Sequence, residues 1–110
     1  MIRDEVYLRH ILDAVEVVRG YAEVGEEAFM RDGMRQDAVV RQLAVIGEAA
    51  KLLSADSRDS EPEIPWREIA GMRDRLIHGY ASVDLNTVWR TVERDIPPLR
   101  EAVRRLLGVA

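Results

Sequence analysis

Apolar residues recur along this chain at the three- and four-residue spacing that is typical of amphipathic helices. The first stripe predicts a helix that begins near Asp4, a suitable N-cap, and continues to about residue 30. A break is expected near Gly20 or Gly25. His10 falls at the edge of the stripe and is interpreted as a surface or boundary residue. The apolar members of the stripe are Leu8, Ile11, Val15, Val18 and Ala22.

After a polar turn at residues 31–35, the segment 36–54 is apolar around most of a helical circumference. Such a helix is normally buried on two sides, so we expect one side to face the intramolecular core and the other a partner subunit. Glu48 lies on its narrow polar strip, where it either pairs with Lys51 or holds Arg73 from a neighbouring helix. The apolar members are Val39, Val40, Leu43, Val45, Ile46, Ala49, Ala50, Leu52 and Leu53.

The middle of the chain predicts a loop followed by a helix. Residues 55–64 are rich in Ser, Asp, Glu and Pro, a composition typical of loops. Residues 66–78 predict one continuous helix. Pro65 suits its first turn, and Gly79 suits the left-handed residue that commonly follows a helix.

A fourth helix follows a connector at residues 81–83. Asp84 is a good N-cap for it, and Pro97 and Pro98 interrupt its backbone hydrogen bonds before a final short helix at residues 99–107. No strand pattern, internal repeat or low-complexity tract occurs. The pattern therefore predicts an all-α fold over residues 1–110 as one domain. We expect an antiparallel bundle of four main helices with the last one kinked or split.

Composition narrows the class of protein. The chain is 47% hydrophobic and 33% charged, which suits a soluble globular domain. Because it has no cysteine, a disulfide framework and a thiolate metal site are both excluded. No apolar run approaches the length of a membrane span, and the first residues have no signal-peptide pattern. A cytoplasmic location without membrane contact is the resulting expectation.

The charge is unevenly distributed. A net charge of −4 argues against a protein that coats nucleic acid through bulk positive charge. Residues 1–30 contain seven acids and three arginines, whereas residues 71–110 contain five acids and seven arginines. Any contact with nucleic acid is therefore expected from the carboxy-terminal part of the chain.

Arg73 falls inside the apolar arc of the helix predicted at residues 66–78. A guanidinium there is costly unless it is paired or opens onto a polar crevice. Asp74 and His78 would lie one helical turn apart, so the carboxylate could orient the imidazole. Tyr80 follows just past Gly79. Together these side chains form a compact set for binding and cleaving a phosphodiester.

Other chemistries are poorly supported by the sequence. No His-Glu-x-x-His motif occurs and the two histidines are far apart, so we expect no metal and no cofactor. Acid–base chemistry by His78 and charge stabilisation by Arg73 remain. They suit RNA because its 2′-hydroxyl supplies the nucleophile. Purely structural alternatives stay open: a surface Asp74–His78 pair, an Arg73–Glu48 salt bridge and a Tyr80 ring packed on the core.

The string Arg73-Asp-Arg-Leu-Ile-His78-Gly-Tyr80 matches Arg-x4-His-x-Tyr, and with it the chain resembles the HepT-like toxins of the HEPN superfamily. Residues 45–51, 62–72 and 83–89 also look like that family's sequence, in the same order. The resemblance implies an all-α bundle that dimerises and cleaves RNA in a shared cleft without metal. By this resemblance, Arg73 and His78 take the catalytic positions and Asp74 fills the polar place after the arginine. Glu48 and Arg75 are taken as supporting residues.

The resemblance also implies a partner. Toxins of this family are commonly encoded with a minimal nucleotidyltransferase antitoxin, which neutralises them by attaching AMP to the motif tyrosine, here Tyr80. The leading hypothesis is therefore a metal-independent endoribonuclease toxin of a toxin–antitoxin pair, acting as a homodimer on RNA. The alternatives are a non-catalytic helical module that binds and supports a nucleotidyltransferase, and a purely structural dimer.

Overall fold

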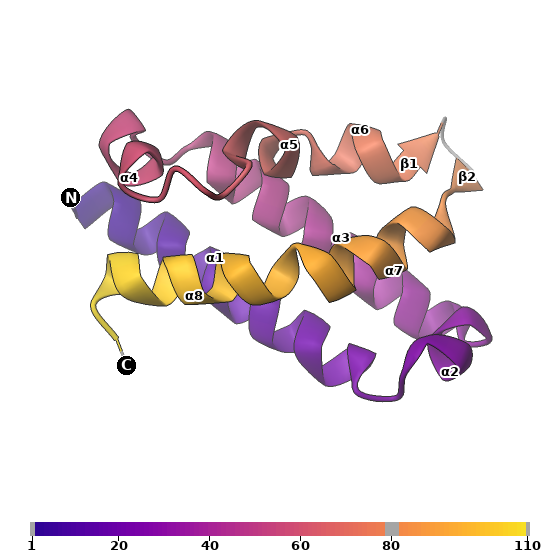
Figure 1. The fold of residues 1–110 in the computed structure, drawn as a ribbon. Helices are drawn as coiled ribbons and strands as arrows, with labels where there is room; N and C mark the ends of the chain where they lie inside the picture. The colour runs from indigo at the N-terminus through magenta and orange to yellow at the C-terminus, as the bar shows by residue number, and fades with distance from the viewer. Residues whose placement is uncertain (1, 79–81, 110) are drawn as a thin grey trace.

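The computed structural model describes residues 2–78 and 82–109, and over these ranges it is a bundle of α-helices (Figure 1). Helix α1 (Ile2–Ala22) and helix α3 (Gly33–Lys51) form its longest antiparallel pair, joined through the short α2 (Glu26–Met30). The predicted break lies at Gly25, whose φ of 88° is readily adopted only by glycine. The all-α prediction is confirmed.

The second half of the chain consists of shorter elements. Helix α4 (Ala55–Ser60) follows the end of α3, and α5 (Trp66–Ala70) and α6 (Met72–Leu76) lie beside α3. Two short strands follow α6. Strands β1 (Ile77–His78) and β2 (Ser82–Val83) form an antiparallel pair, which the sequence pattern did not indicate. Helices α7 (Leu85–Arg94) and α8 (Ile96–Leu107) confirm that the last helix is split. The break lies at Asp95, so Pro97 and Pro98 belong to the first turn of α8 and do not precede the final helix.

One apolar core joins the helices. The ring of Phe29 from α2 lies against that of Trp89 from α7, with centroids 5.2 Å apart. This contact joins the first half of the chain to the second. The predicted cap at Asp84 is confirmed, because its carboxylate accepts a hydrogen bond from the Thr87 amide at 3.1 Å. Fully buried core side chains include Ile11, Val15, Val18, Val39, Leu43, Ile46, Ile69, Met72, Leu76, Ile96 and Leu99.

Asp4 has a different role from the predicted cap. It lies inside α1 and is buried, and its carboxylate accepts hydrogen bonds from the Ser54 and Ser57 hydroxyls at 2.5 and 2.6 Å. The Ser54 amide donates a third at 3.1 Å. These bonds, the one from the Ser54 hydroxyl first, lower the pKa of Asp4. The residue therefore ties the start of α1 to the start of α4.

The loop and helix predicted for residues 55–78 need two corrections. Residues 55–60 form α4, because the Ser54 hydroxyl caps the Ser57 amide. Residues 66–78 do not form one continuous helix. Gly71 separates α5 from α6, and the chain leaves the helical conformation at Ile77, whose φ and ψ are −109° and 117°.

Intramolecular packing explains most of the wide apolar arc of α3. Helix α1 covers one side of α3, and α5 and α6 cover another. The arc by itself therefore does not require a partner subunit. Val45 and Leu52 remain 36% and 51% exposed, and they are the part of the arc that the described chain leaves uncovered.

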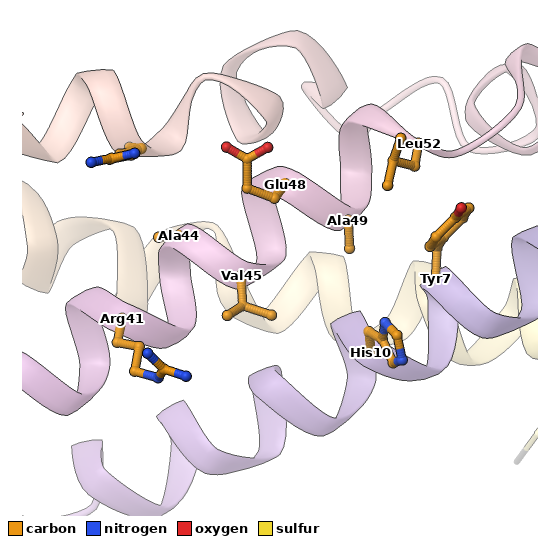
Figure 2. A pocket seen from close by; sticks show the side chains of 9 residues that line it. Tyr7, His10, Arg41, Ala44, Val45, Glu48, Ala49 and Leu52 are labelled. Atoms are coloured by element: carbon orange, nitrogen blue, oxygen red, sulfur yellow. The ribbon is translucent and has the colours of Figure 1, made fainter.

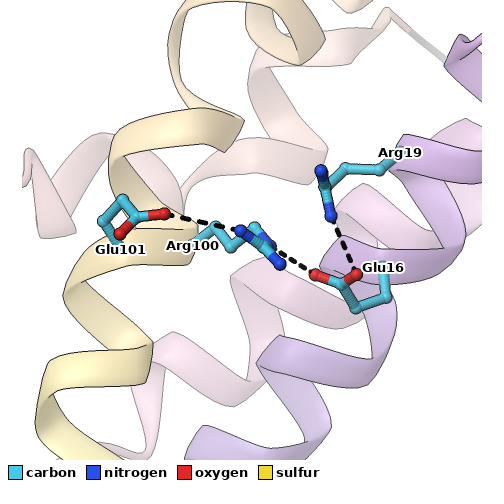
Figure 3. Close-up of polar contacts among 4 residues, drawn as sticks. All are labelled: Glu16, Arg19, Arg100 and Glu101. Atoms are coloured by element: carbon cyan, nitrogen blue, oxygen red, sulfur yellow. Dashed lines mark hydrogen bonds and ion pairs between the residues drawn. The ribbon is translucent and has the colours of Figure 1, made fainter. Parts of the chain in front are cut away.

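Two charged contacts tie α8 to the rest of the bundle. Arg100 donates to Glu16 of α1 at 2.6 Å, and Glu16 also pairs with Arg19 (Figure 3). Arg105 bonds both carboxylate oxygens of Glu61, the closer at 2.7 Å. These arginine contacts lower the pKa values of Glu16 and Glu61.

Candidate functional site

The position of α6 depends on a glycine in α3. A Cβ at Gly47 would lie 2.8 Å from the Ile69 carbonyl oxygen and 3.2 Å from the Met72 Cβ. Only glycine therefore lets the α5–α6 segment approach α3 this closely. The close contact buries Ile69 and Met72 and places the next residue, Arg73, beside the exposed face of α3.

Arg73 opens onto a groove of about 420 Å³ between α1, α3 and α6. Its side chain is exposed, as expected for an arginine that falls on an apolar arc without a buried partner. Figure 2 shows Tyr7 and His10 of α1 on one side of the groove and Glu48 and Leu52 of α3 on the other. The full lining is Tyr7, His10, Arg41, Ala44, Val45, Glu48, Ala49, Leu52 and Arg73.

The groove combines cationic and apolar surface. Glu48 pairs with Lys51 at 3.3 Å, the first of the two partners considered for it. Among the described residues, neither Arg41 nor Arg73 forms a salt bridge. Two guanidinium groups are thus available to an anion that enters the groove.

The motif continues from α6 into the β1–β2 pair. His78 lies in β1 with its backbone opposite Ser82, so it is not in the last turn of a helix. The argument that Asp74 and His78 lie one helical turn apart is therefore wrong. The Leu76 carbonyl accepts the Asp84 amide at 3.0 Å, a long-range bond that stabilises this exit from the helix. Asp74 is exposed on α6.

Part of the predicted site lies outside the described residues. This applies to Gly79, to Tyr80 and to the side chain of His78. The structure places the backbone of His78 two residues beyond the end of α6, and hence on the same segment as Arg73.

Arg75 lies on a different side of α6 from Arg73, since two residues correspond to about 200° around a helix. Its guanidinium donates to Thr91 at 3.1 Å and pairs with Asp95 at 3.2 Å. Arg75 therefore ties α6 to α7 and does not line the groove. Arg75 thus lies within the motif but faces away from Arg73, and whether it supports the site stays a prediction.

Apart from Glu48, the sequence did not indicate the groove residues outside the motif. Arg41 and Tyr7 lie on two helices that meet only in the folded chain, and no local pattern joins them. His10, expected at the surface, is exposed and lines the groove. The described residues contain no group of three metal-ligating side chains, and none of their helices is both long and apolar enough to cross a membrane.

Comparison with known proteins extends the resemblance found in the sequence. Residues 11–106 match the family model described as Ribonuclease HepT-like. A protein of Thermococcus cleftensis named "Probable ribonuclease HepT" is 45% identical over 101 residues, which cover 91% of this chain and 92% of that protein. A protein of Caldanaerobacter subterraneus subsp. tengcongensis, named as a candidate RNase, is 40% identical over 92% of this chain and 91% of its own length. No solved structure shows a significant match.

Proposed function

The chain belongs to the ribonuclease HepT-like family, and from that premise we propose that it is a metal-independent endoribonuclease, the toxin of a toxin–antitoxin pair. The observation that supports this most directly is Arg73. It lies exposed in a groove, without a salt bridge to any described residue, on the segment that leads to His78. An unneutralised guanidinium is suited to a reaction in which negative charge develops on phosphorus.

The proposed reaction uses the RNA's own nucleophile. The 2′-oxygen attacks the adjacent phosphorus while a base removes its proton, and the bond from phosphorus to the 5′-oxygen breaks as that oxygen receives a proton. The products are a 2′,3′-cyclic phosphate and a 5′-hydroxyl. Arg73 binds the phosphoryl oxygens, and the His78 imidazole takes part in one of the two proton transfers. Asp74 and Glu48 supply a polar surround, and no metal is required.

A homodimer would complete the site. Val6, Val45 and Leu52 are 50%, 36% and 51% exposed on the α1–α3 face that forms the groove. A two-fold axis at this face would bury these side chains and bring two copies of Arg73 and His78 to one cleft. The partner chain's imidazole could then carry out the second proton transfer.

A minimal nucleotidyltransferase is the proposed antitoxin, acting by AMP transfer to Tyr80. Tyr80 follows Arg73 by seven residues. We expect the phosphate of the attached AMP to bind the Arg73 guanidinium and so to compete with an RNA phosphate. AMP-modified protein is therefore expected to cleave RNA much more slowly than unmodified protein. Equal rates would contradict this model of neutralisation.

The test is cleavage of total RNA by the purified protein, with end-group analysis of the products. We expect 2′,3′-cyclic phosphate ends from the wild type and none from His78→Ala, provided that circular dichroism shows the variant to be folded. Arg31→Ala, an exposed arginine at the end of α2, is the matched control and should retain activity. Undiminished cleavage by folded His78→Ala would refute the nuclease proposal. It would favour the alternative of a helical module that supports a nucleotidyltransferase.

A further inference from the structure

A second cationic hollow, of about 350 Å³, lies on the α7 side of α6. We propose that it binds a backbone phosphate of single-stranded RNA a few nucleotides from the cleaved bond. This inference rests on the proposed function, which assigns no role to α7. The residues lining the hollow are Arg75, Thr87, Arg90, Arg94 and Asp95.

The charges in the hollow do not balance. Three arginines line it, and Asp95 is the one carboxylate in the lining, already bonded to Arg75 at 3.2 Å. Arg90 and Arg94 are exposed, and neither forms a salt bridge with a described residue. The local excess of positive charge opposes the net charge of −4 of the whole chain. An anion is therefore the ligand that this surface favours.

Helix α7 and Arg75 together fix the shape of the hollow. Thr87, Arg90 and Arg94 recur at three- and four-residue spacing and so share one face of α7. Thr91, fully buried on the same face, accepts a hydrogen bond from Arg75 at 3.1 Å and donates to the Thr87 carbonyl at 2.8 Å. Arg75 is thus held in place by α7. The Arg90 Nε donates to the Asn86 carbonyl at 3.4 Å, and neither Arg90 nor Arg94 forms a salt bridge with a described residue.

Acidic side chains nearby do not cancel this charge. Asp84 caps α7 by accepting from the Thr87 amide at 3.1 Å. Glu93 is exposed and lies about 60° around the helix from Arg90, on the flank of the hollow. A guanidinium can bind a phosphate through two parallel hydrogen bonds, so the two arginines of α7 suit a phosphate ligand.

Proximity to the motif favours RNA over an unrelated anion. Arg75 precedes His78 by three residues, and three residues span at most about 10 Å between Cα atoms. A phosphate bound in the hollow would therefore belong to a nucleotide close to the cut, on a strand that passes from the groove over the β1–β2 pair.

The experiment compares Arg90→Gln/Arg94→Gln with a control of equal charge change, Arg19→Gln/Arg31→Gln. The control arginines are exposed on α1 and at the end of α2 and pair only with exposed glutamates. On a single-stranded RNA of about a dozen nucleotides, we expect the test variant to raise KM about tenfold and to reduce the slope of log affinity against log salt by about 1.4. On a dinucleotide, which is too short to reach the hollow, KM and kcat should equal those of the control.

The outcomes separate this inference from the function it rests on. Equal KM and equal salt slope for the test and control variants on the longer RNA would overturn the phosphate subsite while leaving the nuclease intact. If the wild type cleaves no RNA, the same variants are compared for binding to the longer RNA. A salt-dependent loss confined to Arg90→Gln/Arg94→Gln would keep the subsite and refute the nuclease, whereas equal binding would refute both.

Discussion

Two sides of the bundle use their charges in opposite ways. Where α4 and α8 meet α1, each of three carboxylates has a partner: Asp4 with Ser54 and Ser57, Glu16 with Arg100, and Glu61 with Arg105. We call this the paired side. In the groove between α1, α3 and α6, Arg41 and Arg73 have no such partner among the described residues. The charged contacts of the paired side join helices, whereas the two arginines of the groove are available to bind an anionic ligand.

The difference shows how an unpaired arginine can be held in place. Helix α6 is fixed by the close approach of α3 at Gly47 and by the Arg75 contacts to α7, neither of which uses Arg73. These contacts therefore position the backbone of α6, which places Arg73 at the groove, and its guanidinium stays available for an anion. A substitution on the paired side should change stability, and one in the groove should change activity.

Replacing Arg73 with alanine is the strongest test of this comparison. Because the exposed guanidinium is proposed to stabilise the charged phosphorus, cleavage should fall about 100- to 1,000-fold, the loss typical of one such donor. The melting temperature should stay close to that of the wild type. Arg100→Ala is the counterpart on the paired side and should retain most of the activity. A stability loss for Arg73→Ala larger than that for Arg100→Ala would break the comparison.

Gly47→Ala tests how the groove is built. The new Cβ would press on the Ile69 carbonyl oxygen at 2.8 Å, so the α5–α6 segment must move away from α3. We expect a loss of about 2 to 3 kcal/mol in the free energy of unfolding, within the range for overpacked sites. Cleavage should also fall because Arg73 moves with α6.

The control for that substitution is Gly20→Ala, since nothing lies within 4 Å of a Cβ at Gly20 of α1. It should stabilise the protein by about 0.5 to 1 kcal/mol, because alanine favours a helix interior more than glycine does. Urea denaturation measures both variants. Equal stability of Gly47→Ala and the wild type would show that the close contact does not position α6.

Asp4→Asn tests the most buried contact of the paired side. Its carboxylate accepts three hydrogen bonds, so the substitution should cost about 2 kcal/mol at pH 7. The pKa of Asp4 is lowered by folding, first by the Ser54 hydroxyl, so its stabilisation is present above the unfolded-state value of about 3.9. It is lost as the pH falls below that value toward the lower folded-state pKa.

The stability difference between wild type and Asp4→Asn should therefore be constant from neutral pH down to about 5 and shrink below about 4. Denaturant unfolding across this range measures it. A difference that grows as the pH falls would mean that Asp4 is protonated in the folded protein.

Glu16→Gln should have the smallest effect. The Glu16–Arg100 pair is partly open to solvent, with the two side chains 44% and 24% exposed, so a double-mutant cycle with Arg100→Gln should give only a weak coupling. Salt should weaken this coupling further. A strong coupling that salt does not reduce would mean that the paired side is much less accessible to water than its exposure indicates.

Local sequence determined the features that depend on residues a few positions apart. These include the periodicity of α1 and α3, the break at Gly25, the Asp84 cap, and the existence of a split in the last helix, which lies at Asp95. Such features follow from hydrogen bonds between nearby residues and from the spacing of side chains, both of which can be predicted from the order of residues in the sequence. The sequence also identified Arg73 as an arginine on an apolar arc, but it left open whether that guanidinium is paired with Glu48 or opens onto a crevice.

Tertiary structure determined which helices pack against one another and which side chains they bring into contact. The helix predicted to reach His78 ends at Leu76, whose carbonyl accepts the amide of Asp84. The buried Asp4 carboxylate accepts a hydrogen bond from Ser54 at the start of α4, and Arg75 donates one to Thr91 of α7. The groove itself forms from α1, α3 and α6 only after Gly47 lets two segments touch. Each outcome depends on atoms that are separated along the chain and come into contact only in the folded protein. The spacing of neighbouring residues does not predict these contacts.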